Sequence, residues 1–182
     1  MLFRSGGGNV YLRPNDPALY TFTHPWGNVK LTVQACEMLA PLLRVQPYLN
    51  DSQVFSGQTI DINLDLFRDA EIDFTSGHIA MMYLHTFPKV HADLSQRWLI
   101  ADPSDDYRGC IVVTRTSRYH NQRFSYDTYR EAARDPDAIF LGLPDEYEAM
   151  RKYHPTLKYV PTSDFLKAAE IIAGCRLFVG NQ

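Results

Sequence analysis

The run "CIVVT" at residues 110–114 is apolar up to its final threonine, as a strand buried on both faces of a parallel sheet requires. Three comparable runs follow it: "AIFLG" at 138–142, "LKYV" at 157–160 and "RLFVG" at 176–180. Strands that alternate with helices of about ten residues indicate a parallel sheet with right-handed crossovers. We therefore expect an α/β fold for this part of the chain.

The segments between these runs carry helix signals. Pro144 suits the first turn of one expected helix, and acidic residues follow it at the positive end of the helix dipole. Thr162 or Ser163 is expected to cap the next helix, which Gly174 ends. The predicted buried stripe of that helix consists of Phe165, Ala169 and Ile172.

Residues 1–100 show weaker patterns. A short strand is expected at 9–14, and apolar spacing predicts one helix near 32–46 and another near 76–87. Residues 59–67, "TIDINLDLF", alternate apolar and polar side chains, which predicts a half-buried strand. The stretch "GGGNVYLRP" at 6–14 looks like the second strand of an α/β domain rather than its first, so we expect an α/β domain here.

The polar, turn-rich segment "ADPSDDYRG" at 101–109 is the predicted linker between two domains. We therefore expect a first α/β domain over residues 1–100 and a second over residues 110–182.

Composition excludes several classes of protein. Apolar residues make up 45 % of the chain, which is enough to bury a core. The net charge of −3 argues against a surface that grips nucleic acid, and the apolar runs are too short to span a bilayer. The N-terminus carries no secretory signal. Three cysteines without a CxxC spacing favour buried free thiols in a reducing cytosol, so we expect a cytoplasmic protein without a metal site.

The two ends of the chain have an unusual sequence. "LFRS" at residues 2–5 matches the translation of a common short-read sequencing adapter. "CRLFVGNQ" at 175–182 stops where a strand would lead into a further helix. We therefore expect an internal fragment of a longer protein, read from assembled environmental sequence. A short natural protein that ends on a strand is the alternative, and the reading frame of a clean copy of the locus distinguishes the two.

The loop after the first apolar run is the main candidate site, because ligands of open parallel sheets bind beyond the carboxyl ends of the strands. Residues 115–123, "RTSRYHNQR", hold three arginines, a histidine and several hydroxyls and amides. The planar guanidinium fork matches phosphate oxygens, so we expect a phosphate or diphosphate ligand. The alternative is a solvated loop whose arginines pair with Asp127 and Glu131. The loop contains neither GxxxxGK[ST] nor GxGxxG, which disfavours P-loop and simple dinucleotide sites.

Three segments together resemble a known family. "FLKAAEIIAGCRLFVGNQ" at 165–182 is similar to a helix and strand late in the C-terminal domain of heptosyltransferase-like glycosyltransferases. "IVVTRTSRYHN" at 111–121 and "AIFLGLPDEYEAM" at 138–150 resemble the first two strands of the same domain. The earlier part of the chain resembles the N-terminal half of the family more loosely, through "YLHTF" and "LLRVQPYL".

The resemblance implies the GT-B architecture, with two parallel-sheet, Rossmann-like halves that are both incomplete here. It implies transfer of a sugar from a nucleotide-diphosphate donor to a glycan, lipid or protein acceptor, without a metal or another cofactor. The fragment alone is expected to be inactive. Carried over by position, the donor-binding residues are Arg115, Thr116, Ser117, Arg118, Tyr119, His120, Asn121, Gly142, Thr162, Gly180, Asn181 and Gln182. The alternatives are a non-catalytic Rossmann-like module that binds an anion or nucleotide, and a GT-B-shaped nucleotide-sugar epimerase.

The chain also departs from the family pattern. The family commonly has an acidic residue where Gln182 stands, and its glycine-rich N-terminal loop is absent here. The usual acidic general base lies near that loop, so the sequence identifies no catalytic base. Asp61, Asp65 and His78 are candidates by their position in the first half alone, and a solvated or capping role is the alternative for each.

Overall fold

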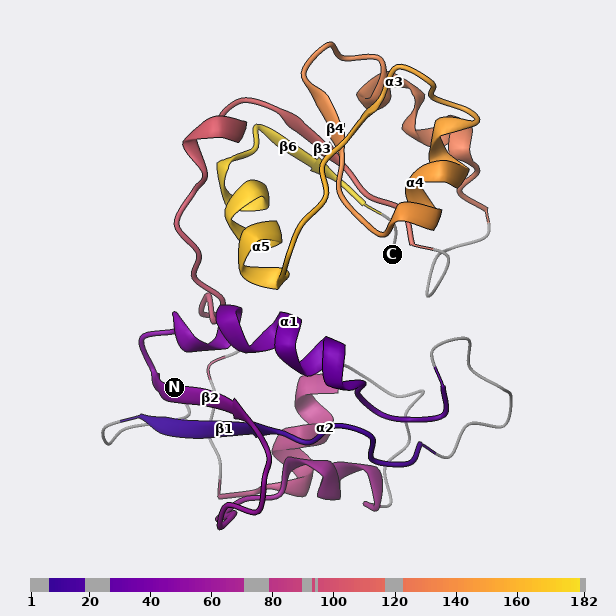
Figure 1. Cartoon of the computed structure of the whole chain (residues 1–182). Coiled ribbons are helices and arrows are strands. Elements are labelled where there is room, and N and C mark those ends of the chain that lie inside the picture. The colour runs from indigo at the N-terminus through magenta and orange to yellow at the C-terminus, as the bar shows by residue number, and fades with distance from the viewer. Residues whose placement is uncertain are drawn as a thin grey trace. The chain divides into compact units, whose positions relative to one another are not determined.

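A computed structural model of the chain describes residues 7–18, 27–70, 79–89, 93, 95–116 and 123–180 (Figure 1). The chain divides into two compact units. The first comprises residues 1–36 and 43–100, and the second comprises residues 37–42 and 101–182.

The second unit is built on a four-stranded parallel sheet, which confirms the expected α/β class. Its strands are β3 (Ile111–Val113), β4 (Ala138–Phe140), β5 (Lys158–Tyr159) and β6 (Leu177–Val179), in the order β5-β4-β3-β6. The first strand along the chain, β3, therefore lies inside the sheet, with the next two strands on one side and the last on the other. This is the strand order of a Rossmann-like sheet.

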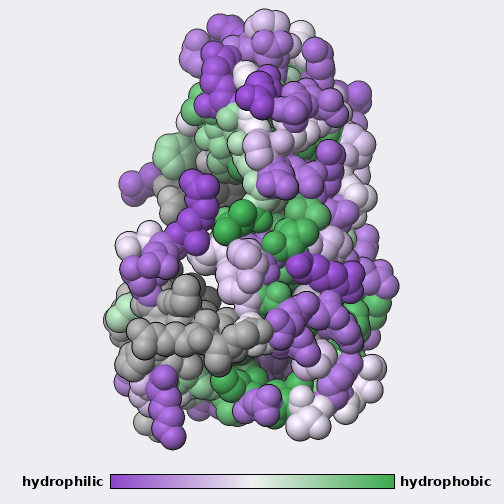
Figure 2. Space-filling view, turned by 90° about the vertical axis from the view of Figure 1, so that its left-hand side faces the viewer, coloured by the Kyte–Doolittle hydropathy of each residue, from purple (hydrophilic) through white to green (hydrophobic). Residues whose placement is uncertain are grey.

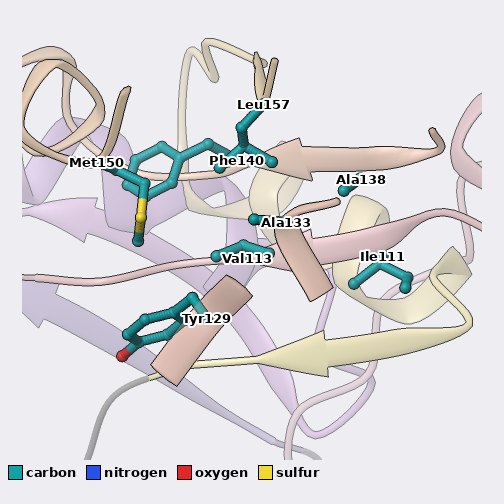
Figure 3. Packing of buried hydrophobic residues seen from close by; sticks show 8 residues of the cluster. All are labelled: Ile111, Val113, Tyr129, Ala133, Ala138, Phe140, Met150 and Leu157. Atoms are coloured by element: carbon teal, nitrogen blue, oxygen red, sulfur yellow. The ribbon is translucent and has the colours of Figure 1, made fainter. Parts of the chain in front are cut away.

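Helices cover both faces of this sheet. One face carries the 3-10 helix η3 (Tyr126–Tyr129), α3 (Arg130–Ala133) and α4 (Pro144–Arg151), and the other carries α5 (Phe165–Gly174). The first core lies between the sheet and the helices of the first face (Figure 3) and consists of Ile111, Val113, Tyr129, Ala133, Ala138, Phe140, Met150 and Leu157. The second core lies under α5 and consists of Cys110, Val112, Ile139, Leu141 and Ile171. Neighbouring residues of a strand enter opposite cores because side chains alternate along a strand.

The N-cap of α5 differs from the prediction. The carboxylate of Asp164 accepts a hydrogen bond from the Lys167 backbone N–H at 2.9 Å, so Asp164 is the cap instead of Thr162 or Ser163. The Ser163 hydroxyl donates to the other carboxylate oxygen at 2.8 Å. A negative charge beside the free N–H groups of a helix start explains the preference for Asp164.

The buried face of α5 also differs from the prediction. Ile171 is fully buried and Ala168 packs against the same core, whereas Phe165 and Ile172 are exposed. The spacing of three residues between Ala168 and Ile171 places both on one helix face. The face that α5 turns to the sheet is therefore offset from the predicted one.

Residues 8–54 form a β-α-β segment of β1 (Gly8–Leu12), α1 (Val33–Arg44) and β2 (Leu49–Val54), whose strands pair in parallel. Both strands and the two ends of α1 belong to the first unit, whereas residues 37–42 of α1 are grouped with the second. The 3-10 helix η1 (Leu64–Arg68) and α2 (Ile79–Thr86) follow. The structure confirms the predicted helices near 32–46 and 76–87 as α1 and α2.

The prediction of a half-buried strand from "TIDINLDLF" is wrong. No strand forms there, and its second half is η1. The Asn63 side chain accepts a hydrogen bond from the Asp65 backbone N–H at 3.1 Å and so begins a helical turn. Phe67 is buried by its ring contact with Tyr83 of α2, at 4.3 Å between centroids, while Ile62 remains exposed. The Asn63 cap and the contact of Phe67 with Tyr83 thus outweigh the alternating apolar and polar pattern, which alone would favour a strand.

Apolar side chains also reach the surface. Figure 2 shows a face on which separate apolar areas interrupt a mostly hydrophilic surface. Exposed apolar residues occur in both units and include Ile60, Ile62, Leu64, Leu66, Trp98, Leu177 and Phe178. No helix in the described ranges has the length and apolar character needed to cross a membrane.

Candidate functional site

The carboxyl ends of the four parallel strands form one edge of the second unit's sheet. At this edge the strand order reverses between β3 and β6, since the chain leaves β3 toward β4 but ends on the opposite side. In open parallel sheets such a reversal opens a crevice between loops that diverge to opposite faces. By this general rule, the candidate ligand position in this sheet lies beside the ends of β3 and β6.

Thr114 and Gly180 meet at this position. The Thr114 backbone N–H donates to the Val179 carbonyl at 2.9 Å, which continues the pairing of β3 with β6 beyond the last strand residues. A Cβ added to Gly180 would lie 3.1 Å from Thr114 Cγ2. The two backbones are thus held side by side where the strands end, and a side chain at position 180 would crowd the gap.

The predicted site residues lie at different strands of this edge. Arg115 and Thr116 follow β3, Gly142 follows β4, and Gly180 follows β6. Thr162 lies beyond β5, the edge strand farthest from β6. The sheet therefore brings the ends of β3 and β6 together and leaves Thr162 apart from them. Ser117, Arg118, Tyr119, His120, Asn121, Asn181 and Gln182 lie outside the described residues.

Arg115 is fixed by contacts on two sides. Its guanidinium carbon lies 4.1 Å from the centre of the Tyr126 ring, and its Nη2 donates to the Phe124 carbonyl at 3.3 Å. Its Nε is buried and has no hydrogen-bond partner among the described residues. No carboxylate of the described part of the chain forms an ion pair with it. The cation therefore has an aromatic face beside it but no counter-charge among these residues.

The alternative pairing of the loop with Asp127 is not what the structure shows for Arg115. Asp127 instead pairs with Arg130, three residues later on the same helical turn. Both of these side chains are largely exposed. Pairs of this kind contribute little to stability, because solvent screens them. The Asp127 carboxylate is thus engaged locally by Arg130.

Gly142 is surrounded by packing contacts. Its carbonyl accepts a hydrogen bond from the Tyr159 hydroxyl at 3.2 Å, and burial raises the pKa of that tyrosine. The Glu146 carboxylate accepts from the Leu143 backbone N–H at 3.0 Å. A Cβ added to Gly142 would lie 2.8 Å from the Phe140 ring. The close approach of the buried Phe140 ring is a packing reason for glycine at this position.

Sequence reasoning missed the residues that support Arg115. The rings of Tyr126 and Tyr153 stack at 4.4 Å with an angle of 4° between their planes. The His154 Nε2 lies 2.8 Å from the Tyr126 carbonyl, and His154 is buried. Because a carbonyl only accepts, Nε2 is the protonated nitrogen in this contact. No local sequence signal links these positions, since only the folded chain brings them together.

The candidate base residues of the first unit have other contacts. Asp65 accepts a hydrogen bond from Lys30 Nζ at 3.0 Å, and Lys30 also contacts Asp16 at 3.2 Å. The hydrogen bond from Lys30 to Asp65 is the largest cause of the raised pKa of Lys30. Asp65 therefore serves a structural ion-pair cluster. Asp61 is exposed, and His78 lies outside the described residues.

Within the described ranges, no three His, Cys, Asp or Glu side chains gather closely enough to hold a metal ion. In the comparisons with known proteins, no family model, no curated protein and no solved structure matches the chain.

Proposed function

We propose that the second unit binds the diphosphate of a nucleotide-sugar donor, as the donor-binding half of a metal-independent GT-B glycosyltransferase. One observation carries the proposal. At the end of β3, where the strand order reverses, the Arg115 guanidinium is held against Tyr126 without a carboxylate partner among the described residues. A diphosphate supplies the missing negative charge, and its oxygens match the planar donors of a guanidinium.

The proposed chemistry needs a positive group at this place. When a glycosyl bond to a nucleoside diphosphate breaks, the leaving diphosphate gains negative charge. A fixed guanidinium stabilises that charge more in the transition state than in the bound donor, which is the condition for catalysis. In this proposal the first unit holds the acceptor, which is a glycan, a lipid or a protein.

Titration calorimetry of the whole chain tests the proposal. Uridine, guanosine, adenosine and cytidine diphosphates are titrated in the presence of a metal chelator, alongside the matching monophosphates. We expect one diphosphate to bind, and its monophosphate to bind at least tenfold more weakly, because the second phosphate makes the contact with Arg115. A chain that binds none of the diphosphates contradicts the proposal. Release of nucleoside diphosphate from the matching sugar donor by this chain would favour an enzyme over a binding module, and it would contradict the expected inactivity of the fragment.

A further inference from the structure

We propose that Tyr126 is a positioning residue that holds the Arg115 guanidinium in place for the donor diphosphate, with Tyr153 and His154 supporting it. This inference rests on the proposed function, since it concerns the same anion site. It assigns to three residues outside the basic loop a role in ligand affinity.

Two contacts restrain the Arg115 side chain. An arginine side chain has many rotamers, and fixing it during binding costs conformational entropy. Here one face of the guanidinium lies on the Tyr126 ring at 4.1 Å, and Nη2 is bonded to the Phe124 carbonyl. The ring also attracts the cation through its π face. The side chain is thus held in one position before any ligand arrives.

Tyr126 is itself restrained by Tyr153 and His154. Tyr153 covers the Tyr126 ring in a nearly parallel stack at 4.4 Å. His154 donates to the Tyr126 carbonyl at 2.8 Å, so both ring and backbone of Tyr126 are fixed. The backbone N–H groups of Tyr153 and His154 both donate to the Met150 carbonyl at 3.0 Å.

A buried methionine connects the stacked rings of Tyr126 and Tyr153 to the first core. Met150 is the buried residue of α4, and it is fully enclosed in the first core, where Figure 3 shows it beside Phe140. The turn that follows α4 is therefore anchored by a buried residue. The position of Arg115 depends, through Tyr126, on a turn from another part of the sequence.

A double-mutant cycle with calorimetric titration of the preferred nucleoside diphosphate separates positioning from simple stabilisation. We expect Tyr126→Leu to weaken binding about fivefold, the scale of one cation–π contact, and Tyr126→Phe to bind as the wild type does. In an Arg115→Ala background, Tyr126→Leu should have no further effect on affinity. If Tyr126 only stabilises the fold, Tyr126→Leu would lower the melting temperature in both backgrounds and leave the affinity of the folded protein for the diphosphate unchanged.

The outcomes are distinct. Wild-type affinity in folded Tyr126→Leu overturns this inference and leaves the proposed function standing, whereas a wild-type chain that binds no diphosphate overturns both. If Tyr126→Leu does not fold, Tyr153→Leu gives the same test, because Tyr153 is exposed and its loss removes only the outer ring. We expect it to weaken binding about twofold in the wild type and not at all in Arg115→Ala. Equal affinity of Tyr153→Leu and the wild type would then overturn the inference.

Discussion

The backbone of Ser104 closes directly over Gly174, the last residue of α5. The Ser104 N–H donates to the Glu170 carbonyl at 2.9 Å, and a Cβ added to Gly174 would lie 2.5 Å from the Ser104 carbonyl oxygen. Real Cβ atoms do not approach a backbone atom this closely, so the contact requires glycine for reasons of space. The segment before β3 is thereby fastened to the end of α5.

Gly174→Ala should therefore destabilise the second unit by about 1–3 kcal/mol, the cost of overpacking a tight contact. Gly180→Ala is the matched control, because the three atoms nearest to its added Cβ belong to the movable side chains of Phe178 and Thr114. Urea unfolding of the two variants measures the difference. Equal stability of both variants would show that the Ser104 backbone moves freely.

The two phenylalanines of the sheet have different environments. Phe140 is fully buried on β4, whereas Phe178 on β6 is 45 % exposed. We expect Phe140→Ala to lower the free energy of unfolding by about 3–5 kcal/mol, from lost burial and the cavity left behind. Phe178→Ala should lower it by about 1 kcal/mol, because removing a half-exposed ring removes fewer buried contacts. Chemical denaturation of both variants tests the sheet order, and a larger loss from Phe178→Ala would contradict it.

Gln46 joins two segments of the first unit through a buried amide. Its Nε2 donates to the Ile100 carbonyl and its Oε1 accepts from the Ile100 N–H, both at 2.9 Å. Gln46→Leu removes both bonds and should cost about 1–3 kcal/mol, because buried polar groups lose their partner. Gln34→Leu, at an exposed position of α1, is the control and should change stability by at most about 0.5 kcal/mol. Thermal unfolding of the two variants compares them, and equal melting temperatures would argue against the Gln46 contact.

Asp135 gives the second unit a predictable response to acid. The Asp137 backbone N–H and the Arg176 guanidinium both bond to its carboxylate, and they hold its pKa below the ordinary value of 3.8. A carboxylate with a lowered folded pKa adds stability above the unfolded pKa and loses it as pH falls through the folded pKa. The stability difference between the wild type and Asp135→Asn should therefore be full at neutral pH and shrink below about pH 4. Unfolding curves at several pH values measure it, and a difference that grows on acidification would refute the assignment.

Much of the second unit follows from local patterns. Short apolar runs such as Ile111–Val113 and Ala138–Phe140 predict buried parallel strands, because a strand inside a parallel sheet is buried on both faces. The order of the strands within the sheet does not follow from local patterns. It depends on the packing of helices against each face, so the reversal between β3 and β6 is visible only in the folded chain.

The errors of sequence reasoning arise where one specific contact outweighs a repeating pattern. Asn63 starts a helical turn within an alternating segment, and Asp164 replaces the predicted hydroxyl cap of α5. The stack of Tyr126 on Tyr153 joins residues from separate turns and leaves no periodic signal. The basic loop was visible in the sequence, but the support of Arg115 was not.

The most direct test of the proposed donor site is the affinity of Arg115 variants for the preferred nucleoside diphosphate, measured by titration calorimetry with a chelator present. Arg115→Ala should weaken binding by about 1.5–3 kcal/mol, the scale for a hydrogen bond to a charged group. Arg115→Lys should recover part of this loss, because a point charge does not reproduce the planar fork. Arg130→Ala, which removes a nearby arginine already paired with Asp127, should bind as the wild type does. Unchanged affinity in Arg115→Ala, or an equal loss in Arg130→Ala, would contradict a diphosphate site at the end of β3.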